Sequence, residues 1–195
     1  MDTGPDPSTT SFYVTDELYQ SLVDDFTGWR ATEREIIDPV FRDSCVRLLN
    51  REARYLDEYA LEDWIGLYAP ECIYWVPASE DGGDPRTEVA ITFEDRRRLE
   101  DRIFRLRTDN AWSQRPVSRT VRLVSGVEVF STDEDDIYML RSAFQTAELQ
   151  GHDARVWSGW SAHRIVDRGA SFEILVKQVN LINCDQNLRN PSIIF

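Results

Sequence analysis

The sequence has few of the residues that usually form catalytic or metal-binding sites. It contains only two histidines, His152 and His163, and three cysteines among 195 residues. It has no closely spaced Cys/His pairs of the kind that ligate an iron–sulfur cluster, no glycine-rich phosphate loop, no nucleophile elbow and no zinc motif. We therefore expect neither a metal site nor a nucleotide site in this chain.

The cysteines are also too few and too scattered for a disulfide framework. Cys45, Cys72 and Cys184 are odd in number, and each lies in an apolar-rich run, which favours reduced core thiols. The sequence has no apolar run of about 18 residues, and no basic region followed by an apolar one at its start. We therefore expect no signal peptide, no membrane-spanning helix and a cytoplasmic protein.

Positive charge is scarce relative to negative charge. Lys and Arg total 22 and Asp and Glu total 35, so the formal net charge is −13. An acidic surface repels phosphate backbones and anionic lipid headgroups, which argues against nucleic acid or a membrane as the main partner. With 42% hydrophobic residues, the chain can bury a core, and a role in binding protein or a small molecule remains.

Residues 99–129 form the stretch around which the rest of the chain is organised. Its first part has apolar residues at i, i+4 and i+7, which are Leu99, Ile103 and Leu106. This spacing places them on one stripe of a helix that docks against a core. Pro116 excludes further helix, and residues 117–129, rich in Val and Thr, predict a strand. The middle of the chain is therefore expected to be a helix that turns back as a strand.

Charged residues near this stretch predict ion pairs. Arg115, Arg119 and Arg122 surround the turn, so we expect them to hold carboxylates of this chain or of a partner. Glu94 and Arg98 have the i, i+4 spacing of a favourable pair on a helix.

The first part of the chain gives two helix signals. Residues 1–11 lack periodicity, which indicates a flexible arm. Thr15 can cap a short helix over residues 16–26. Asp38 as the N-cap, with Pro39 at the first helical position, predicts the start of a long helix.

Glu52 is the carboxylate whose position on the long helix is most unusual. Its spacing brings it close to the buried side, where it needs a cationic or hydroxyl partner. We favour a structural arginine partner over an active-site role. A shorter helix is predicted over residues 61–68, ended by Pro70, and short strands follow at residues 72–78 and 88–93.

The C-terminal part contains three long strands joined by tight turns, which predict an antiparallel meander. They cover residues 137–149, 154–167 and 172–183. In the last strand we place Leu175 and Val179 on one face and Ile174 and Val176 on the other. Because both faces are partly apolar, we expect the helices to cover one face of the sheet and a partner to cover the other.

Helices followed by an antiparallel sheet indicate an α+β fold. We expect a bent sheet wrapped as a cone around the long helix. The predicted organisation is a single cone-shaped domain over residues 38–195, preceded by residues 1–37 as a flexible arm and a short helix.

Three segments of the sequence resemble a known family. They are REARYLDEYALEDWIGLYAPECIYWVPAS (residues 51–79), LEDRIFRLRTDNAWSQRPVSRTVRLVSGVEV (residues 99–129) and KQVNLINCDQNL (residues 177–188). Together and in this order they are similar to the β (small) subunits of bacterial aromatic-ring-hydroxylating dioxygenases. Residues 1–37 lie outside the matched segments, and Val121-Arg122 stands where the family often has a more polar pair.

This resemblance implies a nuclear-transport-factor-2-like (cystatin-like) cone and an assembly of three α and three β subunits. In that family the α subunit holds a Rieske 2Fe-2S cluster and a mononuclear Fe(II) and binds the aromatic substrate, while the β subunit is mainly structural and has no cofactor. It implies contacts with an α subunit and between β subunits, and a complex that makes a cis-dihydrodiol with O₂ and electrons from NAD(P)H.

On the same basis we expect no catalytic, cofactor-binding or metal-binding residue in this chain. The α subunit of that family supplies the substrate pocket, so this sequence does not identify the substrate. An aromatic carboxylate, such as a benzoate or an anthranilate, is the class we consider.

Two alternatives remain open on the residues alone. A stand-alone cone enzyme, such as an isomerase, dehydratase or cyclase, would use Glu52, Tyr55, Asp63 or His163 as general acid and base. A binding module would instead carry a small hydrophobic ligand. In each case residues 187–195 are apolar enough that we expect them to be docked.

Overall fold

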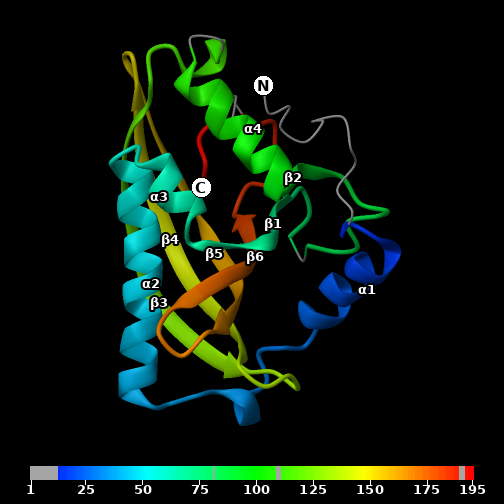
Figure 1. The fold of residues 1–195 in the computed structure, drawn as a ribbon. Helices are drawn as coiled ribbons and strands as arrows, with labels where there is room; N and C mark the ends of the chain where they lie inside the picture. Colours follow the sequence, from blue (N-terminus) through cyan, green and yellow to red (C-terminus); the bar gives the residue numbers. More distant parts are fainter. Residues whose placement is uncertain (1–12, 81, 109–110, 189–191) are drawn as a thin grey trace, which may run out of the picture.

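The computed structural model describes residues 13–80, 82–108, 111–188 and 192–195. The arm expected at residues 1–11 lies outside them. Within the described residues the fold is one curled sheet with helices packed against it (Figure 1). The helices are α1 (Asp16–Asp25), α2 (Pro39–Asp57), α3 (Leu61–Ile65) and α4 (Arg96–Arg107). The strands are β1 (Tyr68–Pro77), β2 (Ala90–Asp95), β3 (Arg119–Ser131), β4 (Ile137–Gln150), β5 (Asp153–Asp167) and β6 (Phe172–Leu181).

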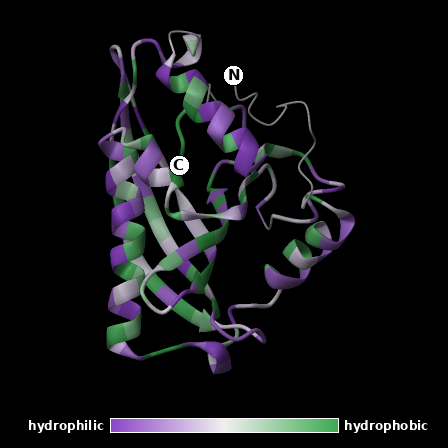
Figure 2. Cartoon of the chain, viewed as in Figure 1, coloured by the Kyte–Doolittle hydropathy of each residue, from purple (hydrophilic) through white to green (hydrophobic). Residues whose placement is uncertain are grey.

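The long helix α2 begins where the sequence predicts and lies along the inside of the curled sheet (Figure 1). The Asp38 carboxylate accepts a hydrogen bond from the Phe41 N–H at 2.7 Å, and Pro39 occupies the first turn. The face toward the sheet is apolar, while much of the outer face is hydrophilic (Figure 2). The buried residues of that face are Cys45, Leu48, Leu49, Glu52, Ala53 and Leu56.

The sheet order is β2-β1-β6-β5-β4-β3, so β3 to β6 form the antiparallel meander that the sequence predicts. β1, the strand that follows α3, pairs with β6 in parallel and so joins the meander at that strand. The β3–β4 pairing shifts register between Ser125 and Glu128, and Gly126 there has φ of +59°. A glycine adopts this conformation without steric cost, so it allows the bulge that bends the strand.

The chain between α2 and α4 differs from the prediction. The helix expected over residues 61–68 ends at Ile65, and Tyr68 already begins β1. Pro70 lies inside β1, at the point where the β1–β6 register shifts, so its missing N–H breaks no ladder bond. The expected Glu94–Arg98 pair is also wrong, because Glu94 lies in β2 and its carboxylate contacts Arg102 at 2.7 Å instead.

The faces of β6 also differ from the prediction. The β5–β6 register shifts between Arg164 and Ile165, opposite Leu175, which is the extra residue of a β-bulge. A bulge reverses the alternation of faces, so Ile174 packs in the main core with Val179, while Leu175 joins a second apolar cluster. A pattern of period two does not reveal such an inserted residue.

The outer face of the sheet is partly covered by the chain itself. Leu22 of α1 packs there with Ile73, Trp75 and Val176, and Trp29 covers a separate apolar cluster. Figure 1 shows α1 on the side of the sheet opposite α2. The expectation that a partner covers this face is therefore wrong where α1 and Trp29 lie.

Replacing Asp38 by alanine is expected to lower the free energy of unfolding by about 1 kcal/mol, because the first turn of α2 loses its side-chain cap. Urea denaturation of the purified chain measures this change. Asp43→Ala is the control, since Asp43 lies on the exposed face of α2 and forms an ion pair with the exposed Arg47. Equal losses in the two variants would contradict the capping role.

Candidate functional site

Glu52 lies inside the cone with its carboxylate surrounded by donors. The residue is on α2 and is only 3% exposed. Its Oε1 accepts hydrogen bonds from the Tyr68 hydroxyl at 2.6 Å and from the Trp64 indole nitrogen at 3.3 Å. The same oxygen lies 2.9 Å from Lys177 Nζ, and Oε2 lies 3.1 Å from His163 Nε2. Residues of α3, β1, β5 and β6 thus meet at one buried carboxylate.

Burial and pairing determine the charges in this cluster. Burial alone would raise the pKa of Glu52, but the Lys177 charge and hydrogen bonds from His163 and Tyr68 hold that pKa well below its usual value. Burial lowers the pKa of His163 and that of Lys177, although Glu52 opposes both shifts. The arrangement is a carboxylate–ammonium pair beside a neutral imidazole. Such a carboxylate is a poor general base, because its low pKa and its donors both resist protonation.

Residues 193–195, here called the 193–195 segment, fill the space beside this cluster. The main-chain oxygen of Phe195 accepts a hydrogen bond from Lys177 Nζ at 2.8 Å, and the Phe195 N–H donates to the Tyr74 hydroxyl at 2.9 Å. The Phe195 ring packs edge-on against Trp157, with 5.2 Å between ring centroids. The cavity that remains has a volume of about 30 Å³, room for one or two waters. The expected docking of this end of the chain is confirmed for residues 193–195.

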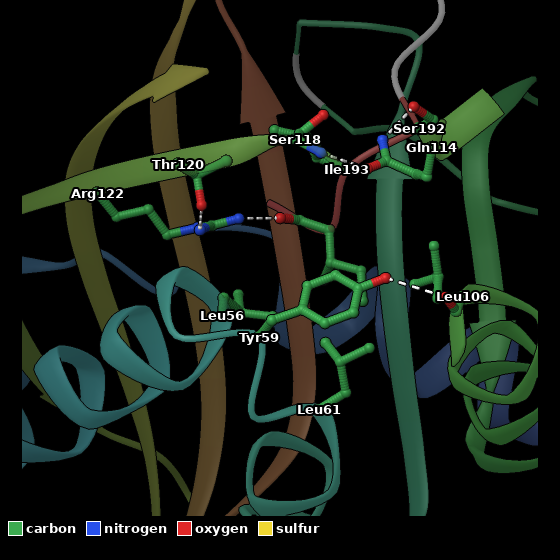
Figure 3. Close-up of a pocket in the computed structure, with 11 residues that line it drawn as sticks. Leu56, Tyr59, Leu61, Leu106, Gln114, Ser118, Thr120, Arg122, Ser192 and Ile193 are labelled. Carbon is green, nitrogen blue, oxygen red and sulfur yellow. Dashed lines mark hydrogen bonds between the residues drawn. The ribbon is translucent and has the colours of Figure 1, made fainter. Parts of the chain in front are cut away.

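Arg122 connects the 193–195 segment to α2. Its guanidinium pairs with Asp57 at 2.5 Å and also donates to the main-chain oxygen of Ile194. The Thr120 hydroxyl and the Arg122 N–H donate to the same Asp57 carboxylate. Figure 3 shows Arg122 and Thr120 at one side of a pocket of about 30 Å³. The prediction that Arg122 holds a carboxylate is therefore confirmed.

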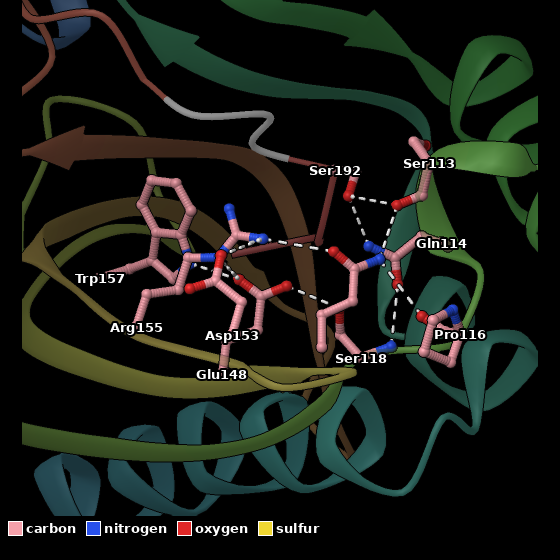
Figure 4. A network of polar contacts seen from close by, with 10 residues as sticks. Ser113, Gln114, Pro116, Ser118, Glu148, Asp153, Arg155, Trp157 and Ser192 are labelled. Carbon is pink, nitrogen blue, oxygen red and sulfur yellow. Dashed lines mark hydrogen bonds and ion pairs between the residues drawn. The ribbon is translucent and has the colours of Figure 1, made fainter.

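A second buried carboxylate, Glu148 on β4, fixes the wall beside Phe195. It accepts hydrogen bonds from the Ser118 hydroxyl at 2.6 Å and from the Trp157 indole nitrogen at 2.7 Å, and Arg155 lies 3.4 Å away (Figure 4). Trp157 in turn contacts Phe195. The network therefore orients the aromatic ring against which the 193–195 segment packs.

Two of the four residues considered for acid–base chemistry lie together in the structure. Glu52 and His163 are in direct contact, whereas Asp63 is exposed on α3 and Tyr55 is half-buried on α2, packed against the main apolar core. The expected arginine partner of Glu52 is wrong, because the cation is Lys177. A lysine inside the apolar run of β6 is the signal that could have identified this partner.

The other chemistry-bearing groups lie outside this cluster. The three cysteines are free and buried, as predicted, and burial raises the pKa of the Cys45 and Cys72 thiols to about 12, which makes them poor nucleophiles. Among the residues that the structure describes, no three His, Cys, Asp or Glu side chains lie close enough together to hold a metal ion. None of the helices within these described residues has the length and apolar character needed to cross a membrane.

Comparison with known proteins relates the sequence to dioxygenase subunits. Residues 51–186 match a family model described as "Ring hydroxylating beta subunit". The chain is 33% identical over 153 residues to benzoate 1,2-dioxygenase subunit beta from Acinetobacter baylyi, an alignment that covers 76% of this chain and 90% of that protein.

Solved structures give the same relationship at the level of the fold. The beta subunit of the benzoate 1,2-dioxygenase from Burkholderia mallei matches with a TM-score of 0.63 and 26% identity, covering 77% of this chain and 95% of that one. A chain of naphthalene 1,2-dioxygenase matches with a TM-score of 0.70 over 93% of this chain and 95% of that one, and at 16% identity it supports the fold alone. The predicted cystatin-like α+β cone is confirmed.

Proposed function

The chain belongs to the family of ring-hydroxylating dioxygenase beta subunits, and on this premise we propose that it is a structural subunit and that another chain of the complex catalyses the reaction. The partner is an α subunit that holds a Rieske 2Fe-2S cluster and a mononuclear iron. Three α and three β subunits form the assembly, with contacts between β subunits. This chain itself then has no catalytic, cofactor-binding or metal-binding residue.

The observation that carries the structural role is the filled interior of the cone. A stand-alone cone enzyme needs a cavity in which its acid and base reach a substrate. Here the acid candidate Glu52 is saturated by donors, and the 193–195 segment occupies the space beside it. The interior thus acts as a core that stabilises the shape of the subunit.

An exposed apolar strip on the sheet fits a contact with another subunit. Val121 and Leu123 on β3 are 62% and 64% exposed, and Val156 on β5 is 64% exposed. Ala147 of β4 lies between them, paired with both Val121 and Val156. Exposed apolar sheet faces usually mark contact surfaces, because leaving them in water is unfavourable. We assign the strip of Val121, Leu123, Ala147 and Val156, here called the valine strip, to the α subunit.

Two relatives support a substrate class for the complex. Benzoate 1,2-dioxygenase subunits from two organisms match this chain, one in sequence and one in structure. We propose an aromatic carboxylate as the substrate of the complex, converted to a cis-dihydrodiol. The α subunit binds this substrate, so this chain affects its turnover only through assembly.

Introducing charge into the valine strip is expected to weaken the complex about tenfold or more, because a carboxylate must lose its water shell in the contact. The variant is Val121→Glu with Val156→Glu, and the yield of co-purified α subunit is the measurement. Val89→Glu is the control, since Val89 is also exposed, at 79%, but lies before β2, away from the strip. Normal assembly of the double variant would place the contact elsewhere on the chain.

The non-catalytic role is tested by Glu52→Gln in the assembled complex. We expect turnover per iron to equal that of the unmodified complex, because no group of this chain takes part in the reaction. Initial rates normalised to iron content separate this result from a simple loss of assembled protein. A loss of tenfold or more in rate per iron would contradict the structural role.

A further inference from the structure

We propose that the inside of the cone is a binding site for small arylalkanoic acids and that the 193–195 segment occupies it as an internal ligand. The shared chemistry is a phenyl ring linked through one or two carbons to a carbonyl oxygen. Phe195 presents this combination to the cone. The proposed site lies within this chain and is separate from the substrate site of an α subunit.

The way in which Phe195 is held resembles ligand binding more than secondary structure. Its main-chain oxygen is bound by the ammonium of Lys177, and its N–H by the hydroxyl of Tyr74. Tyr74 also donates to the oxygen of Phe195, at 3.4 Å. No strand of the described sheet pairs with the 193–195 segment. Side chains of the cone therefore hold the polar end of Phe195.

The other end of the site is aromatic and apolar. The Phe195 ring lies against Trp157, whose indole is fixed by the buried Glu148 carboxylate. Phe144 and Val124 line the same cavity. A phenyl ring that replaced Phe195 would find the same edge-on contact, and such contacts add to the gain from burying the ring.

Two buried polar atoms lining the cavity have no partner within the described chain. They are Nδ1 of His163 and the hydroxyl oxygen of Thr146. Both residues are almost fully buried, at 2% and 1% exposure. Buried polar groups are normally paired, so Nδ1 of His163 can accept a hydrogen bond from a water, and the Thr146 hydroxyl can donate to a ligand oxygen or a water beside Phe195.

The donors at the polar end of the site fit a carboxylate. Lys177 and Arg122 both point donors at main-chain oxygens of the 193–195 segment, and each is already paired with one carboxylate, Glu52 and Asp57 respectively. A ligand carboxylate in place of the Phe195 oxygen would accept a charge-assisted bond from the Lys177 ammonium and a second bond from the Tyr74 hydroxyl.

The test is to remove residues 193–195 from the full chain and to titrate it with 3-phenylpropanoate, which copies the side chain and carbonyl of Phe195. We expect binding by calorimetry, and a rise in Tm of about 5–10 °C at a probe concentration near 100 Kd. The intact chain should bind the acid at least about 100-fold more weakly, because the segment competes for the site. The amide 3-phenylpropanamide should bind the shortened chain about tenfold more weakly than the acid.

Three further variants show which contacts are responsible. Adding Tyr74→Phe to the shortened chain should weaken binding of the acid about tenfold, through one lost hydrogen bond. Adding Phe104→Ala should leave it unchanged, because Phe104 is exposed on α4. Phe195→Gly in the full chain should bind benzene and not the acid, since only the ring position is emptied.

Three results would overturn the proposal. A folded, shortened chain that does not bind 3-phenylpropanoate overturns it. A shortened chain that remains unfolded in the presence of the acid also overturns it, because a true replacement for the segment must restore the fold. Binding that Tyr74→Phe leaves unchanged would place the acid outside the cone and would likewise overturn it.

Discussion

Replacing Lys177 by methionine is expected to lower the free energy of unfolding by about 3–5 kcal/mol, because the Glu52 carboxylate then remains buried without its cation. The ammonium lies 2.9 Å from Glu52 and both side chains are almost fully buried, so water cannot take its place. The change also removes the hydrogen bond from Lys177 to Phe195 and loosens the 193–195 segment. Urea denaturation of the purified chain measures the loss.

A double variant separates the ion pair from simple packing. Glu52→Gln combined with Lys177→Met should regain most of the lost free energy of unfolding, because neither buried charge remains. Arg47→Met is the surface control, expected to change stability by about 0.5 kcal/mol or less, since its pair with Asp43 is exposed. If Lys177→Met behaves like this control, the cluster is not the buried ion pair described here.

Acid is expected to destabilise the fold in two stages. Burial holds the pKa of His163 below its ordinary 6.5. Below pH 6.5 the unfolded chain therefore binds a proton that the folded chain does not bind, and the free energy of unfolding falls. Although burial opposes it, the Lys177 charge holds the pKa of Glu52 well below its ordinary 4.5. The stability that this carboxylate contributes is therefore full above pH 4.5 and is lost as the pH falls further.

The first stage is measured by the urea midpoint at pH 7 and pH 5 for the unmodified chain and for His163→Gln. Glutamine keeps a donor toward Glu52 but does not titrate, so the variant should lose less stability than the unmodified chain between these two pH values. An identical loss in both proteins would assign the effect to groups other than His163.

Local signals in the sequence predict much of the framework. The Asp38-Pro39 start of α2 and the Thr15 cap of α1 are short-range features, and the structure has both. The meander follows from strands that alternate with tight turns. The burial of Glu52 also follows from helical spacing alone, because that spacing determines the direction of a side chain on a helix.

The features that sequence analysis missed depend on contacts between distant residues. The bulge at Leu175 is one extra residue opposite β5, and nothing in the local pattern marks it. Lys177 meets Glu52 only because β6 curls toward α2. Phe195 reaches Tyr74, which is 121 residues away in the sequence, through the closure of the whole cone. Propensity and periodicity describe neighbours along the chain, so they cannot identify such partners.

We propose that this chain is a structural subunit of a dioxygenase whose iron lies in a partner chain. The most direct test is the native mass and the iron and acid-labile sulfide content of the complex that a tag on this chain isolates from its own cells. Our account predicts a complex with a second, larger chain that carries the iron and sulfide. An iron-free assembly of this chain alone that converts a substrate would contradict this account. Glu52 and His163 would then be the candidate acid and base.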